Sequence, residues 1–75
     1  MTGHPRIEID PAKATGKPVV KGTRLSVEFV LGLLADGWDR QRIVDQYPSL
    51  TDDDVSACLA YARDILGSER VYAAE

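Results

Sequence analysis

Few side chains in this 75-residue chain are suited to catalysis, and those few lie far apart in the sequence. The single histidine, His4, lies near the N-terminus, where we expect it to be exposed to solvent. The single cysteine, Cys58, lies on the apolar side of an expected helix, where a buried thiol is the usual outcome. Aspartates 52–54 are explained by the start of that helix, because its dipole stabilises carboxylates there. We therefore expect no catalytic residue, no metal site and no cofactor, and do not expect an enzyme.

Positive and negative charges are separated along the chain, although the net charge is only -3. Residues 1–24 contain five Lys or Arg against two Asp or Glu, whereas residues 25–75 contain four against ten. The first part is therefore basic and the second acidic. A basic segment of this kind favours contacts with phosphate or with an acidic protein, although a solvated surface without a partner explains the pattern equally well.

The basic segment is expected to form two short strands. Residues 6–10 alternate polar and apolar side chains, and residues 17–21 are a β-branched run between two glycines. Pro18 has no N–H to donate, so we expect the second strand at an edge, or paired over only part of its length. Residues 1–25 are thus predicted to be an extended β arm.

Three helices are expected after the arm, because residues that cap a helix alternate with residues that stop one. The expected caps are Ser26, Asp39 and Thr51, and the expected stops are Gly37, Pro48 and Gly67. Asp54 stands three positions after the third cap, as in a capping box. Trp38 is expected to pack on Ile43, with an interface anchor as the alternative reading.

The predicted fold class is mainly α, a helix-turn-helix-like bundle of three helices with a short N-terminal β arm. It is a single domain over residues 1–75, comprising the arm, a three-helix unit over residues 26–66 and a polar tail over residues 67–75. Because so small a core gives little stability, we expect a homodimer formed through the β arm or the first helix. The longest apolar run, residues 29–35, is far shorter than the ~20 residues that span a bilayer, and we expect no signal peptide. We expect a cytoplasmic protein without a membrane contact.

The helix-turn-helix outline makes DNA binding a possibility to be weighed. A recognition helix places its first residues in the major groove, and here those residues are aspartates 52–54. Carboxylates at that position are repelled by the phosphates. The basic residues that remain for phosphate contacts lie on the arm and the second helix, namely Lys17, Lys21, Arg24, Arg40 and Arg42.

Residues 16–24, Gly-Lys-Pro-Val-Val-Lys-Gly-Thr-Arg, together with four shorter segments, resemble the small prokaryotic family called domain of unknown function 433 (DUF433). The four segments are Ile9-Asp10-Pro11, residues 33–37, residues 43–51 and Ala60-Tyr61-Ala62, and the resemblance covers about residues 7–66. The resemblance implies a homeodomain-like unit of three helices with a short N-terminal β element. It also implies an antitoxin, encoded beside a PIN-like toxin of the metal-dependent ribonuclease class.

The first expected function is accordingly an antitoxin-like protein that binds and neutralises a cognate PIN-like ribonuclease toxin. The predicted partner contacts are Lys21 and Arg24 of the arm and Val71 and Tyr72 of the tail. An arginine can compete with the toxin's cation for its metal-binding carboxylates. Equally, the motif of residues 16–24 can serve only to shape the arm. The alternative function is a helix-turn-helix DNA-binding regulator of its own operon, and the two activities can coexist in one small dimer.

Overall fold

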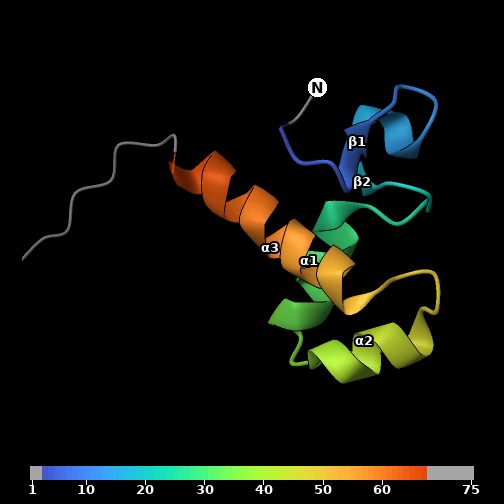
Figure 1. Cartoon of the computed structure of the whole chain (residues 1–75), viewed down its shortest axis with the longest axis vertical. Coiled ribbons are helices and arrows are strands. Elements are labelled where there is room, and N and C mark those ends of the chain that lie inside the picture. The colour runs from blue at the N-terminus through green and yellow to red at the C-terminus, as the bar shows by residue number, and fades with distance from the viewer. Residues whose placement is uncertain (1–2, 68–75) are drawn as a thin grey trace, which may run out of the picture.

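The computed structural model describes residues 3–67, which form three helices and a two-stranded sheet (Figure 1). The elements follow in the order β1 (Ile7–Ile9), the 3-10 turn η1 (Ala14–Gly16), β2 (Pro18–Val20), α1 (Val27–Ala35), α2 (Arg40–Gln46) and α3 (Asp52–Gly67). A mainly helical small domain with an N-terminal β element is what the sequence predicts, so the predicted fold class is confirmed.

Helix α1 begins and ends at the predicted residues. The Oγ atom of Ser26 accepts a hydrogen bond of 3.0 Å from the N–H of Phe29, which caps the first turn. At the other end Gly37 adopts a φ of 96°, and the N–H groups of Gly37 and Trp38 donate to carbonyl oxygens of the last turn at 3.1 and 3.0 Å. This left-handed ending favours glycine, since a side chain there would be strained.

The two strands form an antiparallel pair in which Ile7 lies opposite Val20 and Ile9 lies opposite Pro18. The other side of β2 makes only one isolated bridge, between Val19 and Ser26. The missing N–H of Pro18 therefore falls at the end of the ladder, in agreement with the expectation of incomplete pairing.

The connection between the strands passes through a left-handed turn that the sequence does not predict. Ala14, Thr15 and Gly16 have φ angles of 48°, 55° and 83°, and only the last of them is a glycine. The N–H of Lys17 closes the turn on the carbonyl of Ala14 at 3.1 Å. Because Ala and Thr rarely adopt positive φ, propensity alone does not indicate such a turn.

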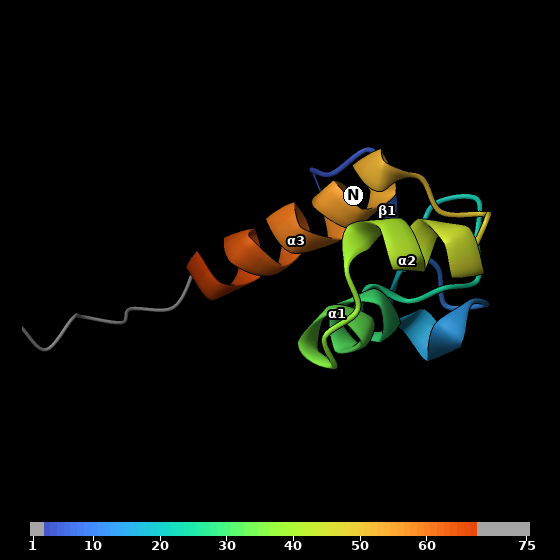
Figure 2. The ribbon, with the colours of Figure 1, turned by 90° about the horizontal axis from the view of Figure 1, so that it is seen from below.

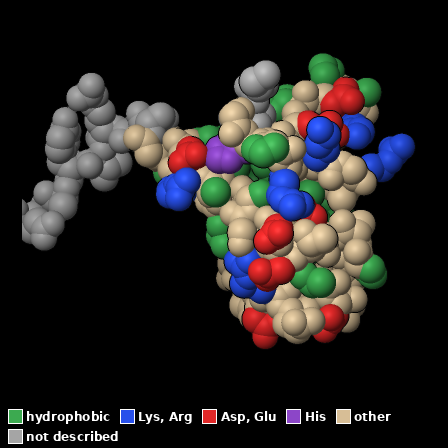
Figure 3. Space-filling view, viewed as in Figure 1, with side chains coloured by type: hydrophobic (Ala, Val, Ile, Leu, Met, Phe, Trp, Pro, Cys, Tyr) green, Lys and Arg blue, Asp and Glu red, His purple; other side chains and the backbone are tan. Residues whose placement is uncertain are grey.

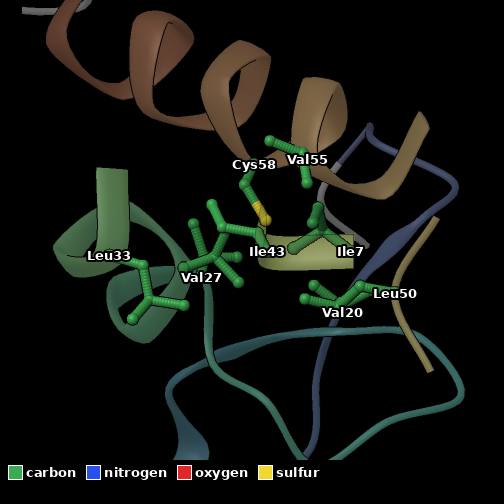
Figure 4. Close-up of a cluster of buried hydrophobic side chains, with 9 residues drawn as sticks. Ile7, Val20, Val27, Leu33, Ile43, Leu50, Val55 and Cys58 are labelled. Carbon is green, nitrogen blue, oxygen red and sulfur yellow. The ribbon is translucent and has the colours of Figure 1, made fainter. Parts of the chain in front are cut away.

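The hydrophobic core draws on the strands as well as on the helices (Figure 4). Its buried members are Ile7, Val20, Val27, Val30, Leu33, Ile43, Leu50, Val55 and Cys58. The β segment is thus one wall of the core and not a free arm, and it holds the turn that follows β2 against the helical unit.

The buried side chains of α3, Asp54, Val55 and Cys58, all lie in its first half, whereas the second half contacts the rest of the domain through partly exposed side chains. Figures 1 and 2 both show its C-terminal turns extending past α1 and α2 into solvent. Near the end of the helix Ile65 and Leu66 are 50% and 62% exposed. None of the helices within residues 3–67 combines the length and the apolar character that crossing a bilayer requires.

Candidate functional site

The end of the family-like motif, residues 20–25, is a tight turn closed by its own hydrogen bonds. The N–H and the hydroxyl of Thr23 both donate to the carbonyl of Val20, at 3.0 and 2.8 Å. The Thr23 hydroxyl oxygen also accepts the N–H of Leu25 at 3.0 Å, and the N–H of Val20 donates to the carbonyl of Leu25 at 2.9 Å. Gly22 supplies the positive φ of 84° that the turn requires. We call residues 20–25 the basic turn.

The basic turn holds two exposed cationic side chains, Lys21 and Arg24. Within residues 3–67, neither side chain has a hydrogen bond or an ion pair. Arg24 borders a hollow of about 690 Å³ that Tyr47 and Ser49 line from the α2–α3 side. Lys21 borders a separate hollow of about 580 Å³. The structure therefore brings the two predicted contacts onto one turn but directs them to different hollows.

Lys17, at the start of the same motif, is occupied within the fold. Its Nζ donates to Oε1 of Glu28 on α1 at 2.8 Å. This hydrogen bond and the opposite charges raise the pKa of Lys17 and lower the pKa of Glu28. Lys17 thus differs from Lys21 although the two lysines flank the same strand.

The two predicted basic residues of α2 also have internal partners. Arg40 donates from Nε to Oδ1 of Asp52 at 2.8 Å, and from Nη2 to the carbonyl of Asp52 at 2.9 Å and to the hydroxyl of Ser56. The hydrogen bond to Asp52 raises the pKa of Arg40 and lowers that of Asp52. Arg42 lies over the Trp38 ring, with its guanidinium carbon 3.8 Å from the ring centroid. Trp38 in turn packs against the edge of the core and lies 6.3 Å from the Tyr47 ring.

The aspartates at the start of α3 have structural roles. Asp54 is only 6% exposed, and its Oδ2 accepts the N–H of Thr51 at 2.9 Å while the Thr51 hydroxyl accepts the N–H of Asp54 at 3.2 Å. The predicted capping box is therefore confirmed. Arg6 completes the cluster, since its guanidinium lies 3.1 Å from Oδ1 of Asp54 and 3.6 Å from Oδ2 of Asp53. In Figure 3 cationic and acidic side chains lie against each other at several places on the face shown.

The expectation of an exposed His4 is wrong. Its side chain is 18% exposed, its Nε2 lies 2.9 Å from Oδ2 of Asp64, and its ring meets the Tyr61 ring edge-on at 5.4 Å. The physical reason is the length of α3, which extends far enough to give the N-terminal segment a ring and a carboxylate to pack on. Sequence spacing does not show this contact, because the residues lie at opposite ends of the chain.

Cys58 is fully buried, as expected. Burial, assisted by the charge of Asp54, raises the pKa of its thiol to about 11, so it is protonated at neutral pH. No group of three or more His, Cys, Asp or Glu side chains within residues 3–67 is placed to hold a metal ion. The predicted tail contacts, Val71 and Tyr72, lie outside the described residues.

A family model described as "Protein of unknown function (DUF433)" matches residues 7–62. Among solved structures, the chain is similar to the crystal structure of a DUF433 member protein from Anabaena variabilis ATCC 29413, with 26% sequence identity and a TM-score of 0.77. The similarity covers 83% of this chain and 61% of that one, so this chain spans less than two thirds of the solved protein's length. No curated protein matches the sequence.

Proposed function

The chain belongs to the DUF433 family of proteins of unknown function, and on this basis we propose that it binds a partner protein as the antitoxin of a PIN-like ribonuclease. The antitoxin role is what the family resemblance of residues 16–24 implies. In this proposal the protein is a binding protein and not an enzyme, and the basic turn is its principal contact with the toxin.

The observation that carries the proposal is the state of the two cations on the basic turn. Lys21 and Arg24 are exposed and have no internal partner within residues 3–67, whereas Lys17 is paired with Glu28. Four hydrogen bonds fix the backbone that carries them. Because the backbone of the turn is already ordered, only the two side chains lose conformational freedom on binding, which favours the use of this turn in recognition.

The chemistry that suits this turn is a cluster of carboxylates. A guanidinium can donate two parallel hydrogen bonds to one carboxylate, and an ammonium adds a compact charge beside it. A PIN-like nuclease has carboxylates that bind its catalytic metal, so Arg24 inserted among them would compete with that cation. The hollow that Arg24 and Tyr47 border gives room for a partner side chain next to Arg24, whereas Lys21 borders the other hollow.

DNA binding remains the competing function, as a regulator of its own operon. The arrangement of α2, a turn and α3 supports it. Two of the five predicted phosphate contacts argue against it. Lys17 and Arg40 form ion pairs with Glu28 and Asp52, and they would have to break these pairs to reach DNA. We therefore place the antitoxin role first.

The test is co-expression of the tagged chain with the product of its adjacent gene, followed by affinity capture and a ribonuclease assay. We expect the wild type to capture the neighbour and inhibit its nuclease. Replacing both Lys21 and Arg24 with alanine should reduce capture at least about tenfold, which corresponds to the loss of about 1.4 kcal/mol. Lys17→Ala is the control, because it removes a positive charge that precedes β2 and is paired with Glu28, and it should leave capture unchanged.

Equal capture and inhibition by the wild type and the double variant would contradict the role of the basic turn. Failure of the folded wild type to capture or inhibit its neighbour would contradict the antitoxin role itself. Titration with duplex DNA from the promoter at increasing salt then tests the competing function, because each phosphate contact makes the slope of log affinity against log salt more negative by about 0.9.

A further inference from the structure

The hollow beside Arg24 is bordered by two segments that are far apart in the sequence, and we call it the Arg24 hollow. The basic turn forms one wall, and residues 46–49 at the end of α2 form the other. Figures 1 and 2 both show the turn after β2 near the connection between α2 and α3. The second wall is also ordered, because the N–H of Tyr47 donates to the carbonyl of Ile43 and the N–H of Leu50 donates to the carbonyl of Tyr47, both at 2.9 Å. Both walls are therefore formed before any partner binds.

The side chain of Tyr47 presents a fixed ring and a free hydroxyl to the Arg24 hollow. The Phe29 ring meets the Tyr47 ring edge-on at a centroid distance of 5.4 Å, and the Trp38 ring lies 6.3 Å away. The Tyr47 hydroxyl has no hydrogen bond within the described part of the chain, and the same holds for the Ser49 hydroxyl and the Gln46 amide. Three polar groups of the lining are thus available to a ligand.

The two hollows beside the basic turn differ in charge. Lys13 and Arg24 line the Arg24 hollow, and none of the described residues in its lining is acidic. Lys21 shares the other hollow, which we call the Lys21 hollow, with the carboxylate of Glu8. Glu8 also pairs with Lys13 at 2.7 Å, so Arg24 is the cation of its hollow that has no partner within residues 3–67. The negative end of the α2 dipole adjoins the Arg24 hollow, but its partial charge is smaller than the full charge of the guanidinium. The Arg24 hollow therefore favours an anion more than the Lys21 hollow does.

We propose that the Arg24 hollow receives one carboxylate side chain of the toxin, an Asp or a Glu, and that Arg24, Tyr47 and Ser49 donate hydrogen bonds to it. Two carboxylate oxygens can accept about four hydrogen bonds, and a guanidinium with two hydroxyl groups can supply them. One projecting side chain suits a hollow with one free cation, whereas the row of phosphates on a duplex is bound by several free cations. The inference rests on the proposed antitoxin function and adds the α2–α3 connection to the contact surface.

Affinity capture of the toxin by variants of the two hollows tests the inference. Ser49→Glu places a carboxylate in the Arg24 hollow, where it competes for Arg24 and repels the carboxylate of the toxin, so capture should weaken at least about tenfold. Ile9→Glu is the matched control, because Ile9 is 52% exposed and lines the Lys21 hollow. It adds the same negative charge, and it should weaken capture by no more than about twofold. Circular dichroism checks that both variants are folded.

A third variant, Tyr47→Phe, separates the role of the hydroxyl from that of the ring. It keeps the ring that packs on Phe29 and Trp38 and removes one hydrogen-bond donor. We expect capture to weaken about fivefold, the effect of one lost hydrogen bond, while the urea midpoint stays unchanged.

The outcomes distinguish this inference from the function on which it rests. Capture by the wild type together with unchanged capture by Ser49→Glu, or with equal losses in Ser49→Glu and Ile9→Glu, would overturn the inference and leave the antitoxin role intact. If Ser49→Glu does not fold, unchanged capture by Tyr47→Phe would overturn it instead. Weaker binding of promoter DNA by Ser49→Glu with unchanged capture would assign the hollow to a phosphate and contradict the carboxylate. Failure of the folded wild type to capture its neighbour would contradict the antitoxin role and this inference with it.

Discussion

Two pairs of cationic residues in this protein differ in whether they have partners within the fold. Arg6 and Arg40 reach the first turn of α3, where aspartates 52–54 bind them at distances of 2.8 to 3.6 Å. Lys21 and Arg24 lie on the basic turn, and neither has an internal partner within residues 3–67. The first pair is used by the fold and the second pair is available to a ligand, although all four belong to the same residue classes.

This difference changes how the charge separation along the sequence is interpreted. The acidic start of α3 binds two of the arginines that a count of basic residues would assign to a partner. The effective basic surface is therefore smaller than the sequence indicates and is concentrated on the turn after β2. Substitutions at the two pairs should consequently affect different measurements.

The largest effect on stability is expected at Asp54, the buried member of the α3 cluster. Asp54→Ala removes the acceptor of the Thr51 N–H and the partner of Arg6. Loss of a helix cap and of a charge-assisted hydrogen bond should lower the free energy of unfolding by about 2 kcal/mol. Urea denaturation followed by circular dichroism measures it.

Asp53→Ala is the control for that experiment. Asp53 is exposed and lies 3.6 Å from the same Arg6, and exposed pairs of this kind contribute little. If both alanine variants lowered the urea midpoint equally, general helix-dipole effects would explain the cluster and the specific role of Asp54 would be lost.

Acid should weaken the second contact of the cluster, between Arg40 and Asp52. Hydrogen bonding from Arg40 lowers the pKa of Asp52 from its ordinary value of 3.8, so the folded state binds fewer protons than the unfolded state. The stabilisation is therefore complete above the ordinary pKa and is lost as the pH falls through the folded value. We expect Asp52→Asn to flatten part of the fall in the urea midpoint between about pH 5 and pH 2.

Other carboxylates also contribute to the loss of stability in acid, and a variant of one of them provides a comparison for Asp52→Asn. The pKa values of Glu28 and Asp64 are also lowered, mainly by hydrogen bonds from Lys17 and Arg63. Glu28→Gln should therefore flatten a further part of the same fall. An unchanged pH profile for Asp52→Asn would mean that Arg40 does not hold this carboxylate in solution.

The sequence predicted the helices well because helix boundaries are local. Ser26, Asp39 and Thr51 stand beside the backbone groups that they cap, and the positive φ of Gly37 needs no distant partner. The left-handed turn of residues 14–16 was missed, because it depends on the way the strands pack and not on the propensity of Ala and Thr. Helix boundaries can therefore be predicted from neighbouring residues, whereas the conformation of this connection depends on tertiary contacts.

The same distinction explains the outcome at the candidate site. Lys17, Lys21, Arg24 and Arg40 have the same appearance in the sequence, and only tertiary contacts separate them. The partner of Lys17 lies 11 residues away, and that of Arg40 lies 12 residues away. Charge composition can thus predict a basic surface, but the subset of cations that remains free requires the folded structure.

A smaller effect on stability is expected at Arg42. It is exposed, like Lys21 and Arg24, but it contacts a side chain of the fold, as Arg6 and Arg40 do. Its guanidinium is exposed to solvent but stacks on Trp38, and exposed contacts of this kind contribute about 0.5–1 kcal/mol. Arg42→Ala should lower the free energy of unfolding by that amount and change the fluorescence of the single tryptophan. Arg42→Lys keeps the charge but loses the flat stacking group, so it should restore only part of the stability. Full restoration would show that charge alone matters there.

The smallest effect on stability, close to zero, is expected for substitutions of Lys21 and Arg24, the pair without internal partners within residues 3–67. The hydrogen bonds that close the basic turn involve Val20, Thr23 and Leu25, and neither cationic side chain takes part in them. Replacing Lys21 and Arg24 together with alanine should therefore change the free energy of unfolding by no more than about 0.5 kcal/mol. A larger loss in urea denaturation would mean that the fold uses these charges after all, and weakened toxin capture by the same variant would then reflect damage to the turn. An unchanged midpoint together with lost capture would assign the pair to recognition alone.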